Sequence, residues 1–206
     1  MRNPARSNSL RRRSTRLQHY DYRQPGAYFF TVCTLGRQCW LGEIKKDEFV
    51  PSTSGEIVLS TWDSLSERYP AVSADAFVVM PNHIHGVIII STPDDTNVGV
   101  QFIAPDPKNQ GVINHAPTLG ECVRVFKAVS TRFIHQAGLN AFGWQRNYYE
   151  HIVRDDAELG RIRKYILENP FRWALDEENP AIQKSSGLLA STLPNSFARD
   201  LNNSAE

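Results

Sequence analysis

Residues 83–90 constrain the fold more than any other segment of the chain. Their sequence is His-Ile-His-Gly-Val-Ile-Ile-Ile, with apolar residues at position 84 and from 86 to 90. Pro81-Asn82 precedes the segment, and a polar stretch follows it from residue 91. A nearly continuous apolar run of this length is typical of a central strand that is covered on both faces. We therefore expect residues 83–90 to lie in the middle of a sheet.

The remaining elements are predicted from periodicity and from the residues that begin or end helices and strands. The segment 155–169 is predicted to be a helix that begins with a capping pair, Asp155 and Glu158. Its regular part is expected to end at Asn169-Pro170, because a residue that precedes proline disfavours the helical conformation. The other predictions are a strand from residue 28 to 34, a small hairpin within 40–50, a helix from 54 to 69, a strand from 76 to 80, a helix from 118 to 138 and a strand from 148 to 153.

The order of these elements is strand, helix, strand, strand, helix, strand, helix. Its core is a βαβ-βαβ repeat, which commonly folds as a split βαβ unit. We therefore predict an α+β, ferredoxin-like fold with an antiparallel sheet and helices mainly on one face. The second helix is expected to pack through Cys122, Phe126, Val129 and Phe133, and the third through Leu159, Ile162 and Ile166.

A chain of 206 residues with 41% hydrophobic residues can bury one good core, so one domain with tails is expected. Residues 1–20 are rich in arginine and predict a basic disordered arm, and residues 21–175 form the expected catalytic domain. Within it, residues 91–117 have little periodicity and predict a flexible loop. Residues 176–206 are predicted to form a polar disordered tail.

Composition excludes several classes of protein. A formal net charge of +1 excludes a uniformly basic nucleic-acid binder, so contacts to DNA must depend on where the charges lie. Three cysteines without CxxC spacing fit neither a disulfide framework nor a cysteine zinc site. No run of about 18 apolar residues indicates a membrane span. We expect a soluble, cytoplasmic protein, associated with the nucleoid when bound to DNA.

His83 and His85 are candidate metal ligands. On a strand, residues two positions apart project to the same face, so both imidazoles can reach one ion. The pair alone is weak evidence, since a buried histidine is often a hydrogen-bonded core residue. Two polar rings on one face of an apolar strand nevertheless both need partners.

Tyr165 and Asn169 form a second candidate group. They lie four residues apart on the third predicted helix, so they are neighbours on one helical face, beside Ile162 and Ile166. If this helix packs on the strand of His83 and His85, the hydroxyl and the amide oxygen reach the same ion. By spacing alone, a core tyrosine and an ordinary helix-end asparagine are the favoured interpretation of these two residues.

Three motifs in order resemble the REP-associated tyrosine transposases, a group of single-tyrosine HUH transposases. They are PNHIHG, FKAVSTRFIH and WQRNYYEHIVRDDAELGRIRKYILENPFRW, and the resemblance runs from about Tyr22 to Trp173. It implies that His83 and His85 are metal ligands, that Tyr165 is the nucleophile, and that Asn169 is the third ligand. Other single-tyrosine relatives carry glutamine at the position of Asn169.

The resemblance further implies a DNA transposase and recombination enzyme that nicks and rejoins single-stranded or hairpin DNA, with REP-type palindromes as the substrate. Tyr165 would attack phosphorus with Mg²⁺ or Mn²⁺ bound, giving a 5′-phosphotyrosine intermediate and a free 3′-hydroxyl. A monomer with its site in cis is expected. The alternatives are a catalytically silent DNA-hairpin binder and an unrelated metal-dependent hydrolase that uses the two histidines.

DNA contacts are predicted from basic residues on the last two helices and the strand between them, where they can line a cationic track. Solvated helix faces are the alternative interpretation. The candidates are Arg124, Lys127, Arg146, Arg161 and Lys164.

Overall fold

The computed structural model describes residues 24–91, 117–176, 178–180 and 182. The predicted basic arm, residues 1–20, lies outside this part of the chain, as do most of the predicted loop, residues 91–117, and most of the predicted tail, residues 176–206.

Four strands form one antiparallel sheet in the order β4-β5-β1-β6. They are β1 (Gly26–Cys33), β4 (Val72–Val79), β5 (His83–Ile90) and β6 (Tyr149–Ile152). The two apolar runs of the sequence, β1 and β5, are the two central strands, and they pair over their full length. The predicted α+β class, the antiparallel sheet and the ferredoxin-like strand order are therefore confirmed.

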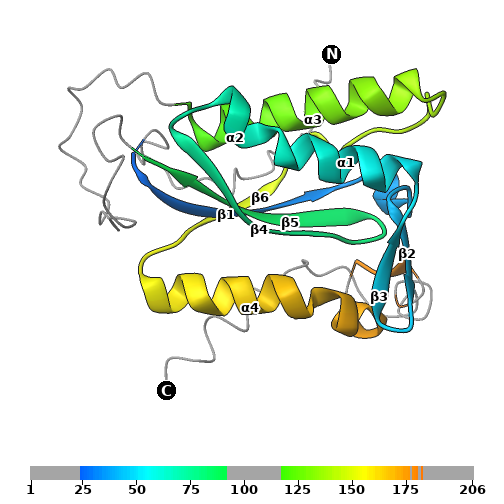
Figure 1. Ribbon diagram of the computed structural model, residues 1–206. Coiled ribbons are helices and arrows are strands. Elements are labelled where there is room, and N and C mark those ends of the chain that lie inside the picture. Colours follow the sequence, from blue (N-terminus) through cyan, green and yellow to red (C-terminus); the bar gives the residue numbers. More distant parts are fainter. Residues whose placement is uncertain (1–23, 92–116, 177, 181, 183–206) are drawn as a thin grey trace, which may run out of the picture.

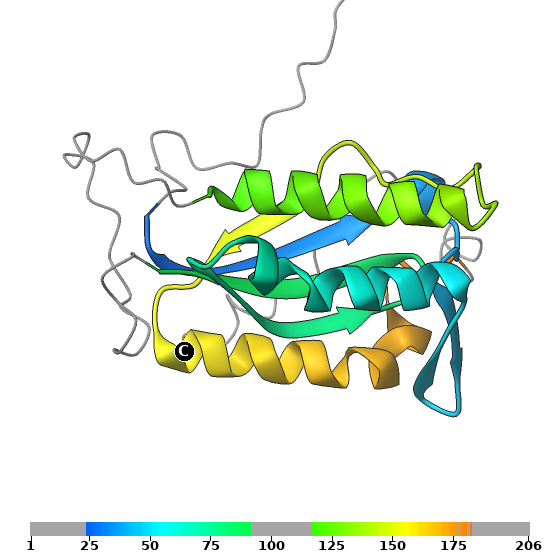
Figure 2. The same ribbon diagram turned by 45° about the horizontal axis from the view of Figure 1, so that its top comes forward.

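The helices cover both faces of the sheet (Figures 1 and 2). On one face lie α1 (Thr53–Asp63), α2 (Leu65–Arg68) and α3 (Leu119–Gln136), as expected for a split βαβ unit. On the opposite face lies α4 (Asp156–Arg172) by itself. None of the described helices is both long enough and apolar enough to cross a membrane.

Each long helix begins at a polar cap, and the cap predicted at Asp155 is confirmed. The Ser52 hydroxyl accepts from the Gly55 amide at the start of α1. Thr118 and Glu121 form a reciprocal capping box at the start of α3. Asp155 accepts from the Glu158 amide at the start of α4, with 2.7 Å between the two atoms. These bonds satisfy amide groups that have no partner inside the helix.

Pro170 does not end α4. The helix continues to Arg172 and passes into a short 3₁₀ turn, η2 (Trp173–Leu175). Proline removes one backbone donor, and in the last turn of a helix this costs a single hydrogen bond. The expected end at residue 169 is therefore wrong by about one turn.

The segment between β1 and α1 carries a 3₁₀ turn, η1 (Leu35–Arg37), and a separate two-stranded sheet, β2 (Gly42–Lys45) and β3 (Glu48–Pro51). Lys46 and Asp47 at its tip have positive φ angles of 51° and 65°. Two such residues form the tight turn that suits a hairpin. The predicted hairpin is confirmed, and β3 contacts α4.

Two boundaries and one helix face differ from the expectations. The predicted helix 54–69 divides at Ser64 into α1 and α2, and β4 begins at Val72 rather than at residue 76. On α3, Phe133 is 47% exposed, whereas Ser130 is buried and accepts a hydrogen bond from the Trp144 indole. A polar residue thus occupies a core position of α3, which an apolar periodicity does not reveal.

The sheet separates two hydrophobic cores. The larger one lies under α1, α2 and α3 and includes Phe30, Trp62, Ile84 and Phe126. The smaller one lies under α4. It contains Ala27, Phe29, Val87, Val153, Leu159, Ile162 and Ile166. The three inward residues predicted for α4 are therefore confirmed.

Gly86 is the point at which β5 approaches the larger core most closely. A Cβ atom at this position would lie 2.9 Å from Phe30 Cζ and 3.1 Å from Trp62 Cη2. Both rings are buried, and Trp62 is also stacked on Phe77 at a centroid distance of 4.3 Å. The rings have little room to move, so the β5 sequence requires glycine here for packing.

We predict that Gly86→Ala lowers the free energy of unfolding by about 1–3 kcal/mol, since an added methyl group overpacks the core. The matched control is Gly160→Ala in α4, where a new Cβ meets no atom within 4 Å. That change should raise stability by up to about 1 kcal/mol, because alanine favours the helix. Urea denaturation followed by circular dichroism measures both. Equal effects of the two variants would contradict this account of Gly86.

Candidate active site

The side chains of β5 alternate between the two cores. Ile84, Gly86 and Ile88 face the larger core, whereas Val87 faces the smaller core under α4. His83 and His85 share the orientation of Val87, because residues two apart on a strand project to one face. Both imidazoles are buried, and their Nε2 atoms lie 3.1 Å apart. The two rings therefore meet on the α4 side of the sheet.

Tyr165 reaches this pair from α4. Its hydroxyl oxygen lies 3.4 Å from His85 Nε2, and the two ring centroids are 5.3 Å apart. Leu159, Ile162 and Ile166 hold the helix against the sheet and leave Tyr165 at the edge of the smaller core. The predicted packing of this helix across the histidine strand is present in the structure.

Phe29 contacts both the His85 ring and the Tyr165 ring. Its ring is stacked on His85 at a centroid distance of 5.5 Å, and it meets Tyr165 edge-on at 6.3 Å. Phe29 lies on β1 and is fully buried. Thr31, also on β1 and directly opposite His85, places its hydroxyl 2.8 Å from His85 Nδ1. The neighbouring strand thus restricts the position of the His85 ring from two sides.

Burial keeps both histidines neutral. It lowers the pKa of His85 to about 3. Burial also lowers the pKa of His83 well below the ordinary value, with His85 and Arg37 as smaller causes. A ring with so low a pKa cannot hold a proton taken from a phenol at neutral pH. His85 is therefore suited to bind a metal or to position Tyr165, and unsuited to act as its base.

Asn169 lies one helical turn after Tyr165 and is almost completely buried, with 2% of its surface exposed. Its Oδ1 atom has no hydrogen-bond partner among the described residues. An unsatisfied buried amide oxygen is costly, and a cation would remove that cost. Two neutral imidazoles and an amide oxygen are donors that a divalent metal accepts.

In the described part of the chain, no group of three or more histidine, cysteine, aspartate and glutamate side chains is arranged to hold a metal ion. The unpartnered amide oxygen of Asn169 is therefore the candidate for a third protein ligand beside His83 and His85.

The residues after α4 also reach the histidines. Trp173 packs against His83 with ring centroids 6.1 Å apart, and Asp176 Oδ2 lies 3.7 Å from His83 Nε2. Glu178 pairs with Arg37 at 2.7 Å. Residues 176, 178 and 179 belong to the segment for which the sequence predicts a polar disordered tail. In the structure they form hydrogen bonds or ion pairs.

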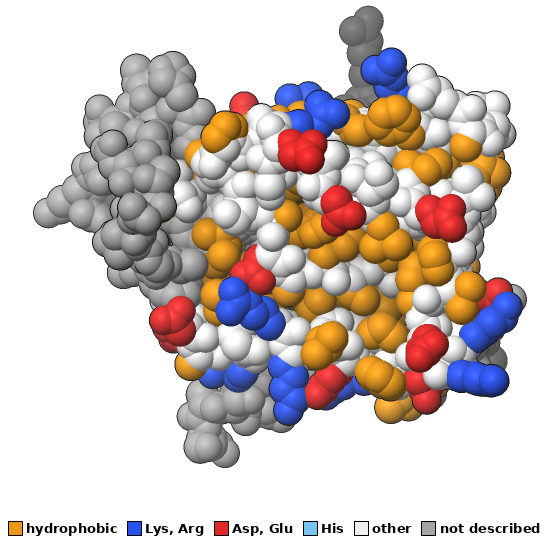
Figure 3. Space-filling view, in the orientation of Figure 1, with side chains coloured by type: hydrophobic (Ala, Val, Ile, Leu, Met, Phe, Trp, Pro, Cys, Tyr) orange, Lys and Arg blue, Asp and Glu red, His pale blue; other side chains and the backbone are white. Residues whose placement is uncertain are grey.

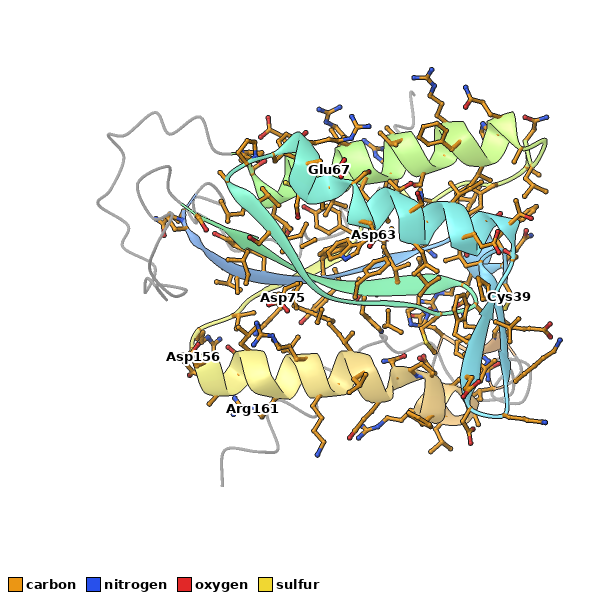
Figure 4. All side chains as sticks on the ribbon, viewed as in Figure 1. Cys39, Asp63, Glu67, Asp75, Asp156 and Arg161 are labelled. Atoms are coloured by element: carbon orange, nitrogen blue, oxygen red, sulfur yellow. The ribbon has the colours of Figure 1, made fainter. Side chains whose placement is uncertain are left out.

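The five predicted DNA contacts lie on different parts of the molecule. Arg124 and Lys127 belong to α3, on the face opposite α4, and the Lys127 ammonium donates to the carbonyl oxygens of Gln145 and Arg146. Arg161 and Lys164 are on α4, where Figure 4 shows Arg161 on the side away from the sheet.

Charged side chains do not gather into one patch on the face shown in Figure 3. Lys and Arg form separate groups there, with Asp and Glu between them and hydrophobic side chains across the middle. An ion pair joins α4 to the sheet, because Arg163 of α4 pairs with Asp75 of β4. Figure 4 shows Asp75 on the side of the sheet that faces α4. This face therefore offers no continuous cationic track among the described residues.

Sequence reasoning did not identify Phe29, Thr31, Asn82, Trp173 or Asp176. Phe29 and Thr31 face the histidines only because β1 and β5 pair in one particular register. The proximity of Trp173 and Asp176 depends on α4 continuing beyond Pro170. Asn82 was visible within the PNHIHG motif, and its position next to His83 was the available signal.

Known proteins resemble the chain in sequence and in fold. A Haemophilus influenzae protein described only as uncharacterized is 38% identical over 168 residues, which is 81% of this chain and 92% of that protein. A second protein from H. influenzae, provisionally assigned as a REP-associated tyrosine transposase, is 26% identical over 158 residues, 74% of each chain. No family model matches the chain.

The third similarity is structural. A REP-associated tyrosine transposase, solved bound to a REP hairpin, superimposes with a TM-score of 0.52 at 19% identity. The match covers 90% of this chain and 96% of that one. At this identity the match establishes a shared fold.

We predict that the metal-free protein loses stability as the pH falls below 6.5. In the unfolded chain both histidines bind protons from about pH 6.5 downward, whereas in the folded protein His85 remains neutral until about pH 3. The unfolded state therefore binds more protons in this range, and the free energy of unfolding decreases with falling pH by at most about 1.4 kcal/mol per pH unit for each histidine.

Urea denaturation at several pH values, with a chelator present, measures this slope. His85→Gln should make it shallower. A variant with the same slope as the wild type would show that His85 titrates alike in the folded and unfolded states.

Proposed function

Because the chain belongs to one family with the 38% identical H. influenzae protein and is related in sequence and in fold to the REP-associated tyrosine transposases, we propose that it cleaves and rejoins DNA through Tyr165. The reaction would form a covalent 5′-phosphotyrosine intermediate. The proposed substrate is single-stranded or hairpin DNA, since a relative of the same fold was solved on a REP hairpin.

The observation that carries this proposal is the convergence of Tyr165 and the two histidines. The hydroxyl lies 3.4 Å from His85 Nε2, which in turn lies 3.1 Å from His83 Nε2. The groups come from α4 and β5, 80 residues apart in the sequence. A tyrosine that served only the core would not need its hydroxyl beside two buried imidazoles.

The side chains at the site offer lone pairs that could bind a divalent metal ion. His83, His85 and Asn169 would hold the ion, because their lone pairs lie in a buried region and the Asn169 oxygen lacks another partner. A bound Mg²⁺ or Mn²⁺ would polarise a non-bridging oxygen of the scissile phosphate. Phe29 would keep the His85 and Tyr165 rings in place for the reaction.

In the proposed step, Tyr165 Oη forms a bond to phosphorus while the bond from phosphorus to the 3′-oxygen breaks. The products are a phosphotyrosine on the 5′ side and a 3′-hydroxyl. We assign the phenol proton to solvent, since His85 is a poor base, and the departing 3′-oxygen takes one proton from solvent. Attack by another 3′-hydroxyl releases Tyr165 and rejoins the strand. One phosphodiester replaces another in each exchange, so no ATP is required.

We also propose that a monomer carries a complete site. Tyr165 meets His85 within one chain, which supports a site in cis. The basic residues Arg161 and Lys164 of α4 remain the proposed DNA contacts nearest in sequence to Tyr165, with Arg124, Lys127 and Arg146 as more distant ones.

The test of this function is a denaturation-resistant protein–DNA adduct. With Mn²⁺ and a labelled hairpin flanked by single strands, the wild type should form the adduct, and Tyr165→Phe should reduce it below detection because the nucleophilic oxygen is missing. Tyr149→Phe is the matched control. Tyr149 also packs on the Phe29 ring, with the two ring centroids 6.3 Å apart, so this variant should retain the adduct.

Three results would contradict the proposal. An adduct that persists in Tyr165→Phe would exclude this nucleophile. Hairpin binding without an adduct would indicate a catalytically silent binder. Metal-dependent cleavage without an adduct would indicate a hydrolase that uses the two histidines and leaves Tyr165 a structural role.

A further inference from the structure

Asn82 lies directly before His83 and is fully buried. Its Nδ2 group donates two hydrogen bonds to backbone carbonyl oxygens, one to Arg37 at 3.1 Å and one to Glu178 at 2.6 Å. Its Oδ1 atom lies 2.9 Å from His83 Nδ1. Every polar atom of this side chain is therefore engaged, and the three contacts come from three separate segments.

These contacts determine which way the amide of Asn82 faces. A carbonyl oxygen can only accept a hydrogen bond, so the NH₂ group must face Arg37 and Glu178. Oδ1 must then face His83. Since Oδ1 can only accept, His83 Nδ1 must carry the proton.

The tautomer of His83 follows from this assignment. An imidazole that binds a metal ion is neutral, so it carries a single N–H group. With the proton on Nδ1, the Nε2 atom presents a lone pair. Nε2 is the atom that faces His85 Nε2 at 3.1 Å and Asp176 at 3.7 Å.

His85 is held less strictly. Its Nδ1 faces the hydroxyl of Thr31, which can donate or accept. In the metal-free protein, His85 can therefore protonate Nε2 and donate to the lone pair of His83. It can equally protonate Nδ1 and present a second lone pair. The tautomer of His83 is therefore set by Asn82, whereas Thr31 allows either tautomer of His85.

We propose that Asn82 is a positioning residue for the metal site: it holds His83 in the tautomer whose Nε2 binds the ion, and it fixes the ring by way of Arg37 and Glu178. This inference rests on the proposed metal-dependent function and adds a residue to it. Hydrogen bonds of this kind behind a metal-binding histidine typically change metal affinity by about 10–100-fold. The link to Glu178 also makes the tautomer depend on the segment that follows α4.

Three substitutions separate this role from a purely structural one. Asn82→Leu removes the acceptor, Asn82→Asp retains an oxygen acceptor toward His83 Nδ1, and Asn179→Leu is the control. Asn179 donates to the Trp173 carbonyl oxygen in the same neighbourhood.

These variants can be compared by two measurements that do not require DNA cleavage. Histidine ¹⁵N spectra of the chelated protein report which ring nitrogen carries the proton, and calorimetry reports Mn²⁺ affinity. We expect an Nδ1–H tautomer of His83 in the wild type, in Asn82→Asp and in Asn179→Leu. In Asn82→Leu we expect a mixture of tautomers and a loss of Mn²⁺ affinity of about 10–100-fold.

An Nε2–H tautomer of His83 in the wild type would overturn the proposal, as would wild-type Mn²⁺ affinity in Asn82→Leu. If Asn82→Leu does not fold, the wild-type and Asn82→Asp spectra still decide the tautomer. The proposed function fails separately: a protein with this tautomer and this metal affinity but no DNA adduct would refute the nucleophile and leave the role of Asn82 intact.

Discussion

The packing of α4 against the sheet is the interaction on which the candidate site depends. Leu159, Ile162 and Ile166 are buried there against Phe29 and Val87. Burial of an aliphatic side chain of this size contributes about 1.5–3 kcal/mol. Tyr165 follows Ile162 by three positions, so the same apolar contact that attaches the helix also sets the hydroxyl beside His85. The position of the proposed nucleophile is thus a consequence of core packing.

The two imidazoles are polar groups that lie buried beside the smaller hydrophobic core under α4. Both are buried in a region that is otherwise largely aromatic and aliphatic, and desolvation holds them neutral. Their remaining nitrogen atoms are engaged by Asn82 and Thr31, which reduces the cost of burial. A neutral, oriented imidazole pair is a poor source of protons and a good pair of ligands, which agrees with the proposed use of Tyr165 with a divalent cation.

The sequence predicted the relations between residues that are close along the chain, and it did not predict contacts between distant segments. The spacing of His83 and His85 fixed their common face, and the spacing of Tyr165 and Asn169 their common helical side, because both relations are local. The pairing of β1 with β5 is not local, so Phe29 and Thr31 were missed as partners of the histidines. The sequence rule for proline predicted that the helix ends before Pro170, but α4 continues to Arg172. The contacts of Trp173 and Asp176 with His83 were therefore not predicted.

We propose that His83, His85 and Asn169 hold one divalent ion beside Tyr165, and anomalous diffraction from crystals soaked in Mn²⁺ can locate that ion. We expect one manganese peak bonded to Nε2 of His83, Nε2 of His85 and Oδ1 of Asn169, next to the Tyr165 hydroxyl. Manganese bound only elsewhere, with the two histidine Nε2 atoms still hydrogen-bonded to each other, would refute this metal site.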